Sequence, residues 1–192
     1  MRRMDSETIE TLVSGTGETL PILIVPHPIL KARTRPVGPA DAAAVRALLP
    51  KMFATMYRAP GIGLAAPQVG VLLRVAIVDV MPDDKPAPIA MINPEIVATS
   101  TELATREEGC LSIPGQYAEV TRPARVKVRY SDAAGARREI EAEGLLAACL
   151  QHEIDHLDGV LFIDYLSSLK RNIIVRRLAK ELRQKRDEAA GR

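Results

Sequence analysis

The sequence predicts an α+β fold in which one buried helix lies among β-strands. Two segments have the pattern of strands: residues 72–80, LLRVAIVDV, are a short β-branched run, and residues 124–130, ARVKVRY, alternate apolar with basic side chains. The third observation is the segment 145–157, LLAACLQHEIDHL, which consists mainly of good helix formers and contains neither glycine nor proline. A helix of this composition between strand segments is expected to be buried among them.

The remaining segments add a second helix and a hairpin. Residues 41–58 begin with Asp41, a residue type that caps helices well. The apolar side chains of this segment recur at helical spacing: Val45, Leu48, Leu49, Met52, Phe53 and Met56. After residue 130 the turn-rich sequence SDAAGA is expected to lead the chain back into residues 138–144. Residues 21–38 start apolar but are broken by prolines, which favours a short edge segment over the core.

Composition indicates one globular domain without a membrane span. The chain has 192 residues, of which 47% are hydrophobic and 26% charged, and its net charge is +2. A chain of this length can bury one sizeable core. It contains no run of about 18 apolar residues. The basic first residues lead into acidic ones rather than into an apolar stretch, so a signal peptide is not expected.

Cysteine usage points to a reducing compartment. Only Cys110 and Cys149 occur, which is too few for a disulfide framework. The chain is therefore expected in the cytoplasm, where thiols stay free. A cysteine with a function in this chain would bind a metal or take part in redox chemistry.

The strongest motif is HEIDH, residues 152–156. His152 and His156 are four residues apart, so on a helix they share one face and can bind the same metal ion, while Glu153 lies beside that ion as a base. Two histidines at this spacing can also be ordinary helix residues. The chain has only three histidines, however, and two of them fall in this pattern with the glutamate in register, which favours a metal site. The third, His27, is expected in a loop.

The third ligand decides which class of hydrolase the motif belongs to. The metzincin pattern requires a histidine at position 162, where this chain has Phe162. A thermolysin-like site needs a glutamate from another helix, and the nearest downstream candidate, Glu181, lies in a strongly basic segment. Cys149 shares a helical face with both histidines. It lies about 10 Å from His156 along a helix, however, which is too far for both to bind one ion at ~2.1–2.3 Å.

Cys110 is the stronger candidate, since it comes from a distant segment and can approach the helix from the side. It lies in REEGCLSIPG, residues 106–115, where Gly109 lets the backbone come close to a ligand or a metal. An isolated cysteine of this kind is more often an ordinary buried residue. The metal motif elsewhere in the chain favours a ligand, and Cys149 is then expected to be a small apolar wall beside the metal.

A glycine-rich stretch suggests a different function. Residues 61–66, GIGLAA, fit the dinucleotide-binding pattern G-x-G-x-x-G/A. A helical segment precedes them where a strand is required, and PQVG follows where a helix should begin, so nucleotide binding is disfavoured. The glycines are better explained by close approach of the backbone to a ligand, and Gln68 offers an amide that can donate and accept hydrogen bonds.

Taken in order, three motifs resemble those of the peptide deformylase family: GIGLAAPQVG (61–70), EEGCLSIPG (107–115) and QHEIDHLDG (151–159). The resemblance extends over residues 21–171, most of the chain. It implies the deformylase-type α+β fold, with β-sheets around a central helix that carries the HExxH motif. It also implies the family's activity, removal of the N-formyl group from the formylmethionine that begins newly synthesised polypeptides.

The resemblance also implies roles for individual residues. The metal ligands would be Cys110, His152 and His156. Glu153 would be the general acid and base, and Gln68 with the backbone N–H of Leu111 would hold the formyl oxygen. The substrate would contact Ile62, Gly63, Gly109 and Cys149, the last of these beside the methionine side chain. Gly115 and Tyr117 stand where some family members carry charged residues, so the preference after methionine stays open.

The donor set leaves the metal open. One thiolate and two imidazoles suit zinc, iron, cobalt or nickel. The resemblance implies one divalent ion, Fe(II), in the cell, with zinc, nickel or cobalt able to replace it in prepared protein.

The C-terminal segment differs in charge from the rest of the chain. Residues 166–192 contain nine Lys or Arg and three acidic residues, so their charge is +6 against −4 for the remainder. Such a helix is often only a solvated face, but it can also bind an acidic polymer. Since the family acts on nascent chains, ribosomal RNA is expected as a partner beside formyl-Met peptides, whereas DNA and membranes are not. The expected organisation is a mobile leader at 1–18, a catalytic deformylase domain at 19–168 and a basic helix or tail at 169–192.

Two other functions stay open at the level of sequence. A zincin-type metallopeptidase would cleave internal bonds of unformylated peptides. A non-catalytic ribosome-binding protein with a structural zinc would need both cysteines and both histidines of the motif as ligands, with no open position. The helix distance between Cys149 and His156 opposes the second of these.

Overall fold

The computed structural model describes residues 17–191, so the leader predicted for residues 1–18 lies outside the described residues except for its last two. The α-helices are α2 (Ala42–Arg58), α3 (Gly144–Leu157) and α4 (Ser168–Ala189). The strands are β1 (Gly63–Ala65), β2 (Val75–Val78), β3 (Ile89–Thr99), β4 (Leu103–Cys110), β5 (Ile113–Pro123), β6 (Arg125–Ser131) and β7 (Arg137–Glu143). Five 3₁₀ helices complete the described chain: η1 (Pro28–Lys31), η2 (Pro39–Asp41), η3 (Ala66–Val69), η4 (Pro82–Asp84) and η5 (Phe162–Tyr165). The α+β class predicted from the sequence is confirmed.

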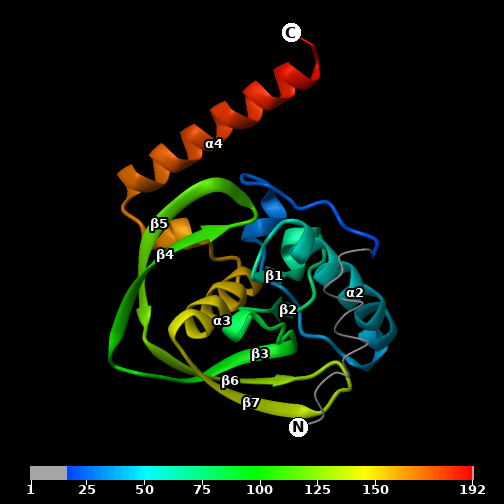
Figure 1. Ribbon diagram of the computed structural model, residues 1–192. Helices are drawn as coiled ribbons and strands as arrows, with labels where there is room; N and C mark the ends of the chain where they lie inside the picture. The colour runs from blue at the N-terminus through cyan, green and yellow to red at the C-terminus, as the bar shows by residue number, and fades with distance from the viewer. Residues whose placement is uncertain (1–16, 192) are drawn as a thin grey trace.

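The strands form two antiparallel sheets around α3. One sheet has the order β1-β2-β3-β6-β7, and the other is the β4–β5 hairpin. Figure 1 shows α3 at the centre of the molecule, with the β4–β5 hairpin arching past one side, β3, β6 and β7 below, and α2 on the far side of β1 and β2. In the same view α4 leaves the body beside β5 and extends away from it. No helix among residues 17–191 is long and apolar enough to cross a bilayer.

Helix α3 is buried because it is apolar on several faces. Its side chains Ala147, Leu150, Ile154 and Leu157 pack in one cluster with the sheet residues Met91, Val126, Val128 and Ala142. A helix that is apolar nearly all round is stable only inside a protein. The polar side chains of its motif are therefore carried into the interior, where any group without a partner is costly.

Several predicted elements are present nearly as expected. The helix predicted over 41–58 is α2, and the strand predicted over 72–80 is the shorter β2. The strand predicted over 124–130 is β6, which pairs with β7 across the predicted turn. The edge segment predicted over 21–38 is mainly irregular: it contains η1 and a single parallel bridge between Arg35 and Leu73.

Strands β3, β4 and β5 have no clear pattern in the sequence. Strand β3 contains Pro94 and has Asn93 at φ 53°, which interrupts its pairing with β6. Strand β4 reads LATREEGC, with Glu108 buried and most of the rest exposed, and β5 contains Pro114 and Gly115. Period-two alternation is lost in such strands, so their existence depends on pairing partners far away in the chain.

Helix α4 begins at a local cap and packs on the body through one face. The Ser167 hydroxyl accepts a hydrogen bond from the Lys170 N–H, as expected for an N-cap. Ile174 and Leu178 are buried in a cluster with Ile113 and Val120 of β5 and with residues of η5. The first half of α4 therefore shares a core with the segment that was expected to end at residue 168.

Candidate active site

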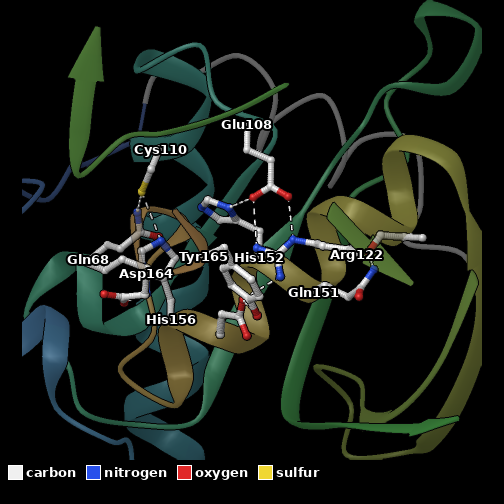
Figure 2. Close-up of polar contacts among 12 residues, drawn as sticks. Gln68, Glu108, Cys110, Arg122, Gln151, His152, His156, Asp164 and Tyr165 are labelled. Atoms are coloured by element: carbon white, nitrogen blue, oxygen red, sulfur yellow. Dashed lines mark hydrogen bonds and ion pairs between the residues drawn. The ribbon is translucent and has the colours of Figure 1, made fainter. Parts of the chain in front are cut away.

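Three side chains that can bind a metal come together where β4 ends beside α3. The ligand atoms of Cys110, His152 and His156 all lie within 4.8 Å of one another. The Cys110 Sγ is 3.2 Å from the His156 Nε2 (Figure 2). No second group of this kind occurs in the described part of the chain. The structure thus brings together the three residues that the sequence motifs suggested as ligands.

A β-bulge directs Cys110 at the helix. Strands β4 and β5 pair regularly up to Gly109, which faces Tyr117, and the register then shifts so that Cys110 faces Ile113. A bulge of this kind turns a side chain away from the direction that regular pairing would give it. The cysteine leaves the hairpin at this point and approaches the two histidines from the side.

A buried ion pair holds His152 in place. The His152 Nδ1 lies 2.9 Å from the Glu108 Oε2, and Glu108 is bound by Arg122 through Nε at 2.6 Å and Nη2 at 3.0 Å (Figure 2). Burial alone would raise the pKa of Glu108, but the hydrogen bonds from His152 and Arg122 outweigh burial and lower the pKa. The ionised carboxylate accepts the Nδ1–H of His152, which leaves Nε2 free to bind a metal.

The same arginine connects the motif to η5. The Arg122 Nη1 lies 2.7 Å from the Asp155 Oδ2, which also accepts the Tyr165 hydroxyl at 2.9 Å. The Arg122 Cζ lies 4.5 Å from the centre of the Tyr165 ring. Arg122 and Tyr165 lie outside the three sequence motifs, and the motif HEIDH suggested no role for its Asp155. One signal could have found Glu108. Residues two apart in a regular strand point to the same face, and Cys110 comes two residues after Glu108.

The two remaining motif residues have buried atoms without a partner. Neither the His156 Nδ1 nor the Glu153 Oε2 has a hydrogen-bond partner in the part of the chain that the structure describes. Burial lowers the pKa of His156 well below its usual value, so its imidazole is neutral, the form that binds metals. Burial also raises the pKa of Glu153 to about 7. A buried carboxylate without a partner beside three donor atoms fits a site built for a metal and a water molecule.

Cys149 lies beside this group but outside it. Its Sγ lies 3.5 Å from the Ile62 carbonyl oxygen, and burial raises the pKa of its thiol well above the usual value. A thiol that does not ionise is a poor metal ligand. A Cβ at Gly63 would collide with the Glu153 carboxylate and would lie 2.9 Å from the Cys149 Sγ. Glycine at this position therefore lets β1 approach the motif helix.

Gln68 is oriented as a hydrogen-bond donor to the site. Its Oε1 accepts the Ala65 N–H at 2.8 Å, so its Nε2 points the other way. The Nε2 lies 3.2 Å from the Ser112 Oγ and 3.5 Å from the Cys110 Sγ. With its oxygen occupied, the amide presents N–H groups to the space beside Cys110.

One open cavity of about 550 Å³ leads to these residues. Its walls include every residue expected in the site except His156: Ile62, Gly63, Gln68, Gly109, Cys110, Leu111, Cys149, His152 and Glu153. His156 lies behind the wall and is 1% exposed. Arg106, Tyr117 and Leu145 also line the cavity, and their exposure to solvent places them in its outer part. A cavity of this size can hold a short extended peptide.

The family model described as polypeptide deformylase matches residues 19–172, which include the cavity and all three candidate ligands. The chain belongs to the polypeptide deformylase family. The chain is 53% identical to the curated peptide deformylase of Mesorhizobium japonicum over 166 aligned residues. This alignment covers 86% of this chain and 94% of the relative. It is 56% identical to the peptide deformylase of Methylocella silvestris over 164 aligned residues, and this alignment covers 83% of each chain.

Solved deformylase structures have the same fold. The peptide deformylase from Legionella pneumophila superposes with a TM-score of 0.81 at 46% identity, over 87% of this chain and 97% of the other. The peptide deformylase from Ehrlichia chaffeensis in complex with actinonin superposes with a TM-score of 0.82 at 40% identity, over 86% and 98% of the chains. The predicted deformylase fold, with sheets around a central helix, is confirmed.

Proposed function

We propose that the chain is a peptide deformylase, a metal-dependent hydrolase that removes the formyl group from N-terminal formylmethionine. Family membership over most of the chain supports this activity. The observation that carries it is the open cavity, because Cys110 and His152 line it, with His156 behind them, beside the buried Glu153, whose Oε2 has no partner among the described residues. A structural zinc with four protein ligands is disfavoured, since Cys149 bonds the Ile62 carbonyl oxygen instead.

We assign the chemical steps to residues at the inner end of the cavity. A divalent ion held by Cys110, His152 and His156 would supply a Lewis acid that makes water nucleophilic near neutral pH. Glu153, through its free Oε2, would take the proton of the attacking water and return it to the departing amine. The Gln68 Nε2 and the Leu111 N–H would donate to the formyl oxygen as it gains charge, and a fixed donor of this kind contributes about 3 kcal/mol.

The outer cavity would hold the substrate peptide. Ile62, Gly63 and Gly109 line the cavity with backbone from the start of β1, including the residue before it, and from the end of β4, which suits pairing with an extended chain. Leu145, Ala148 and Cys149 of α3 also line the cavity, and they would provide apolar surface for the methionine side chain.

We further propose Fe(II) as the ion in the cell and the cytoplasm as the compartment. A thiolate with two imidazoles suits iron as well as zinc, cobalt or nickel. Both cysteines are free in the structure, as expected in a reducing environment. Metal analysis of protein purified without oxygen is expected to find iron, and zinc under those conditions would contradict the assignment.

The proposed activity is tested with protein prepared without oxygen. We expect it to release formate from formyl-Met-Ala-Ser and to leave the same peptide with an N-acetyl group intact. A blocked peptide without a formyl group serves as the control for peptidase activity. Cleavage of its internal bonds without release of formate would favour the metallopeptidase instead.

We propose that the exposed basic face of α4 contacts ribosomal RNA. Arg176, Lys180 and Arg183 are exposed on this helix, whereas Ile174 and Leu178 on the opposite face are buried, so removal of the whole helix would also damage the core. Replacing all three basic residues by glutamine is expected to weaken ribosome binding. The slope of log K against log salt concentration should fall in magnitude by about 3 at most, one for each lost phosphate contact. Formyl-peptide hydrolysis should not change. Equal ribosome affinity at every salt concentration would refute the contact.

A further inference from the structure

One acidic side chain in the basic helix α4 contacts the β5 segment that lines the substrate cavity. Glu181 is the single acid among eight Lys or Arg between Lys170 and Arg186. It is partly buried, and its Oε1 accepts a hydrogen bond from the Gln116 Nε2 at 3.0 Å. Its Oε2 lies 3.7 Å from the position that a Cβ of Gly115 would occupy. Both contacted residues line the substrate cavity.

Packing of α4 on β5 fixes the place of Glu181. Ile174 and Leu178 are buried against β5, and Leu182 packs partly buried on the same cluster. Residues at positions i, i+4, i+7 and i+8 lie on one helical face, so Glu181 belongs to the face that packs. Its carboxylate is therefore held at β5 by neighbouring apolar contacts.

The contacted segment forms one wall of the outer cavity. Gly115, Gln116 and Tyr117 follow one another in β5 and line the cavity. The Tyr117 ring lies over Gly109: a Cβ there would be 2.5 Å from the Tyr117 Cε1. Tyr117 is 64% exposed, so one face of its ring is open to whatever occupies the cavity mouth. The reacting end of the site is built from other elements, chiefly α3 and the end of β4.

We propose that Glu181 is a positioning residue that holds the Gly115–Tyr117 wall through Gln116 and thereby sets the binding of substrate residues beyond methionine. The proposal rests on the proposed deformylase function. Gln116 is only 7% exposed, so its amide donor has little access to water if the acceptor is lost. An unsatisfied buried donor is unfavourable, and the side chain would turn to find another partner. Tyr117, the next residue, would move with it.

The test compares a short and a long formylated substrate. For Glu181→Ala we expect KM for formyl-Met-Ala-Ser-Ala to rise about 3- to 10-fold, with kcat within twofold of wild type. This range follows from the modest net contribution of one hydrogen bond. Kinetics on formyl-Met-Ala should stay within twofold, because on this proposal its single residue after methionine does not reach the Tyr117 wall. Glu181→Gln keeps an acceptor oxygen and is expected to restore the wild-type KM. Glu188→Ala removes the same charge from an exposed position of the same helix and is the matched control.

A double-mutant cycle with Gln116→Leu adds a second measurement. If the two side chains act through their hydrogen bond, the combined variant should bind the long substrate no worse than Gln116→Leu alone. An equal change in KM for both substrates in Glu181→Ala would overturn the proposal. So would an equal rise in KM for the long substrate in Glu181→Ala and Glu181→Gln. Loss of kcat on both substrates together with a lower Tm would make Glu181 a structural residue, which also overturns it. If wild-type protein cleaves neither formylated peptide, the deformylase function itself fails.

Discussion

Replacing Glu153 with alanine is expected to lower kcat on formyl-Met peptides by about 10²- to 10⁴-fold or more, the range for loss of a positioned acid and base. Glu153 is buried, lines the inner cavity and has an Oε2 without a partner among the described residues. It is not one of the three residues whose ligand atoms lie within 4.8 Å of one another. The variant is therefore expected to retain its metal, as measured by metal analysis of the purified protein.

Stability distinguishes this chemical role from a structural one. A buried carboxylate without a partner costs free energy, so its removal should not lower Tm. Glu153→Gln preserves the volume and is the matched control: it should be as inactive as Glu153→Ala, because an amide cannot accept the proton of water at neutral pH. Near-normal turnover in either variant would remove Glu153 from its proposed role.

Replacing Cys110 with serine is expected to lower metal retention at least 100-fold in a competition with a chelator. Loss of a group that only orients a ligand already costs about 10- to 100-fold in affinity, and loss of a ligand should cost more. A serine hydroxyl does not ionise as a thiol does, so it is a poor replacement for a cysteine ligand beside the two histidines. The measurement is metal content after dialysis against a graded chelator.

Cys149→Ser is the control for this experiment, since the chain has no other cysteine. The Cys149 Sγ lies by the Ile62 carbonyl oxygen, and a serine hydroxyl can donate a hydrogen bond to the same atom. Metal retention should therefore match that of wild type, while methionine binding weakens modestly because the wall becomes more polar. If Cys149→Ser loses the metal and Cys110→Ser keeps it, the two assignments must be exchanged.

Features that depend on local spacing can be predicted from the sequence alone. The helix of residues 145–157 follows from its composition, and the shared face of His152 and His156 follows from helix geometry. Helix geometry also separated Cys149 from the candidate ligands. The β6–β7 hairpin follows from alternation and turn residues. Each of these features depends on residues that are close in the chain, so it can be predicted without knowing how distant segments pack.

The distant groups that support the motif can be identified only in the folded chain. Glu108, Arg122 and Asp155 belong to two strands and a helix, and each is buried or partly buried only because β4, β5 and α3 pack together. Strands β3 to β5 exist through their pairing, since their own residues alternate poorly. The contact between Glu181 and Gln116 depends on the packing of α4 on β5. Spacing along a chain fixes which side chains share a face, but the partner that a face meets depends on how the whole chain packs.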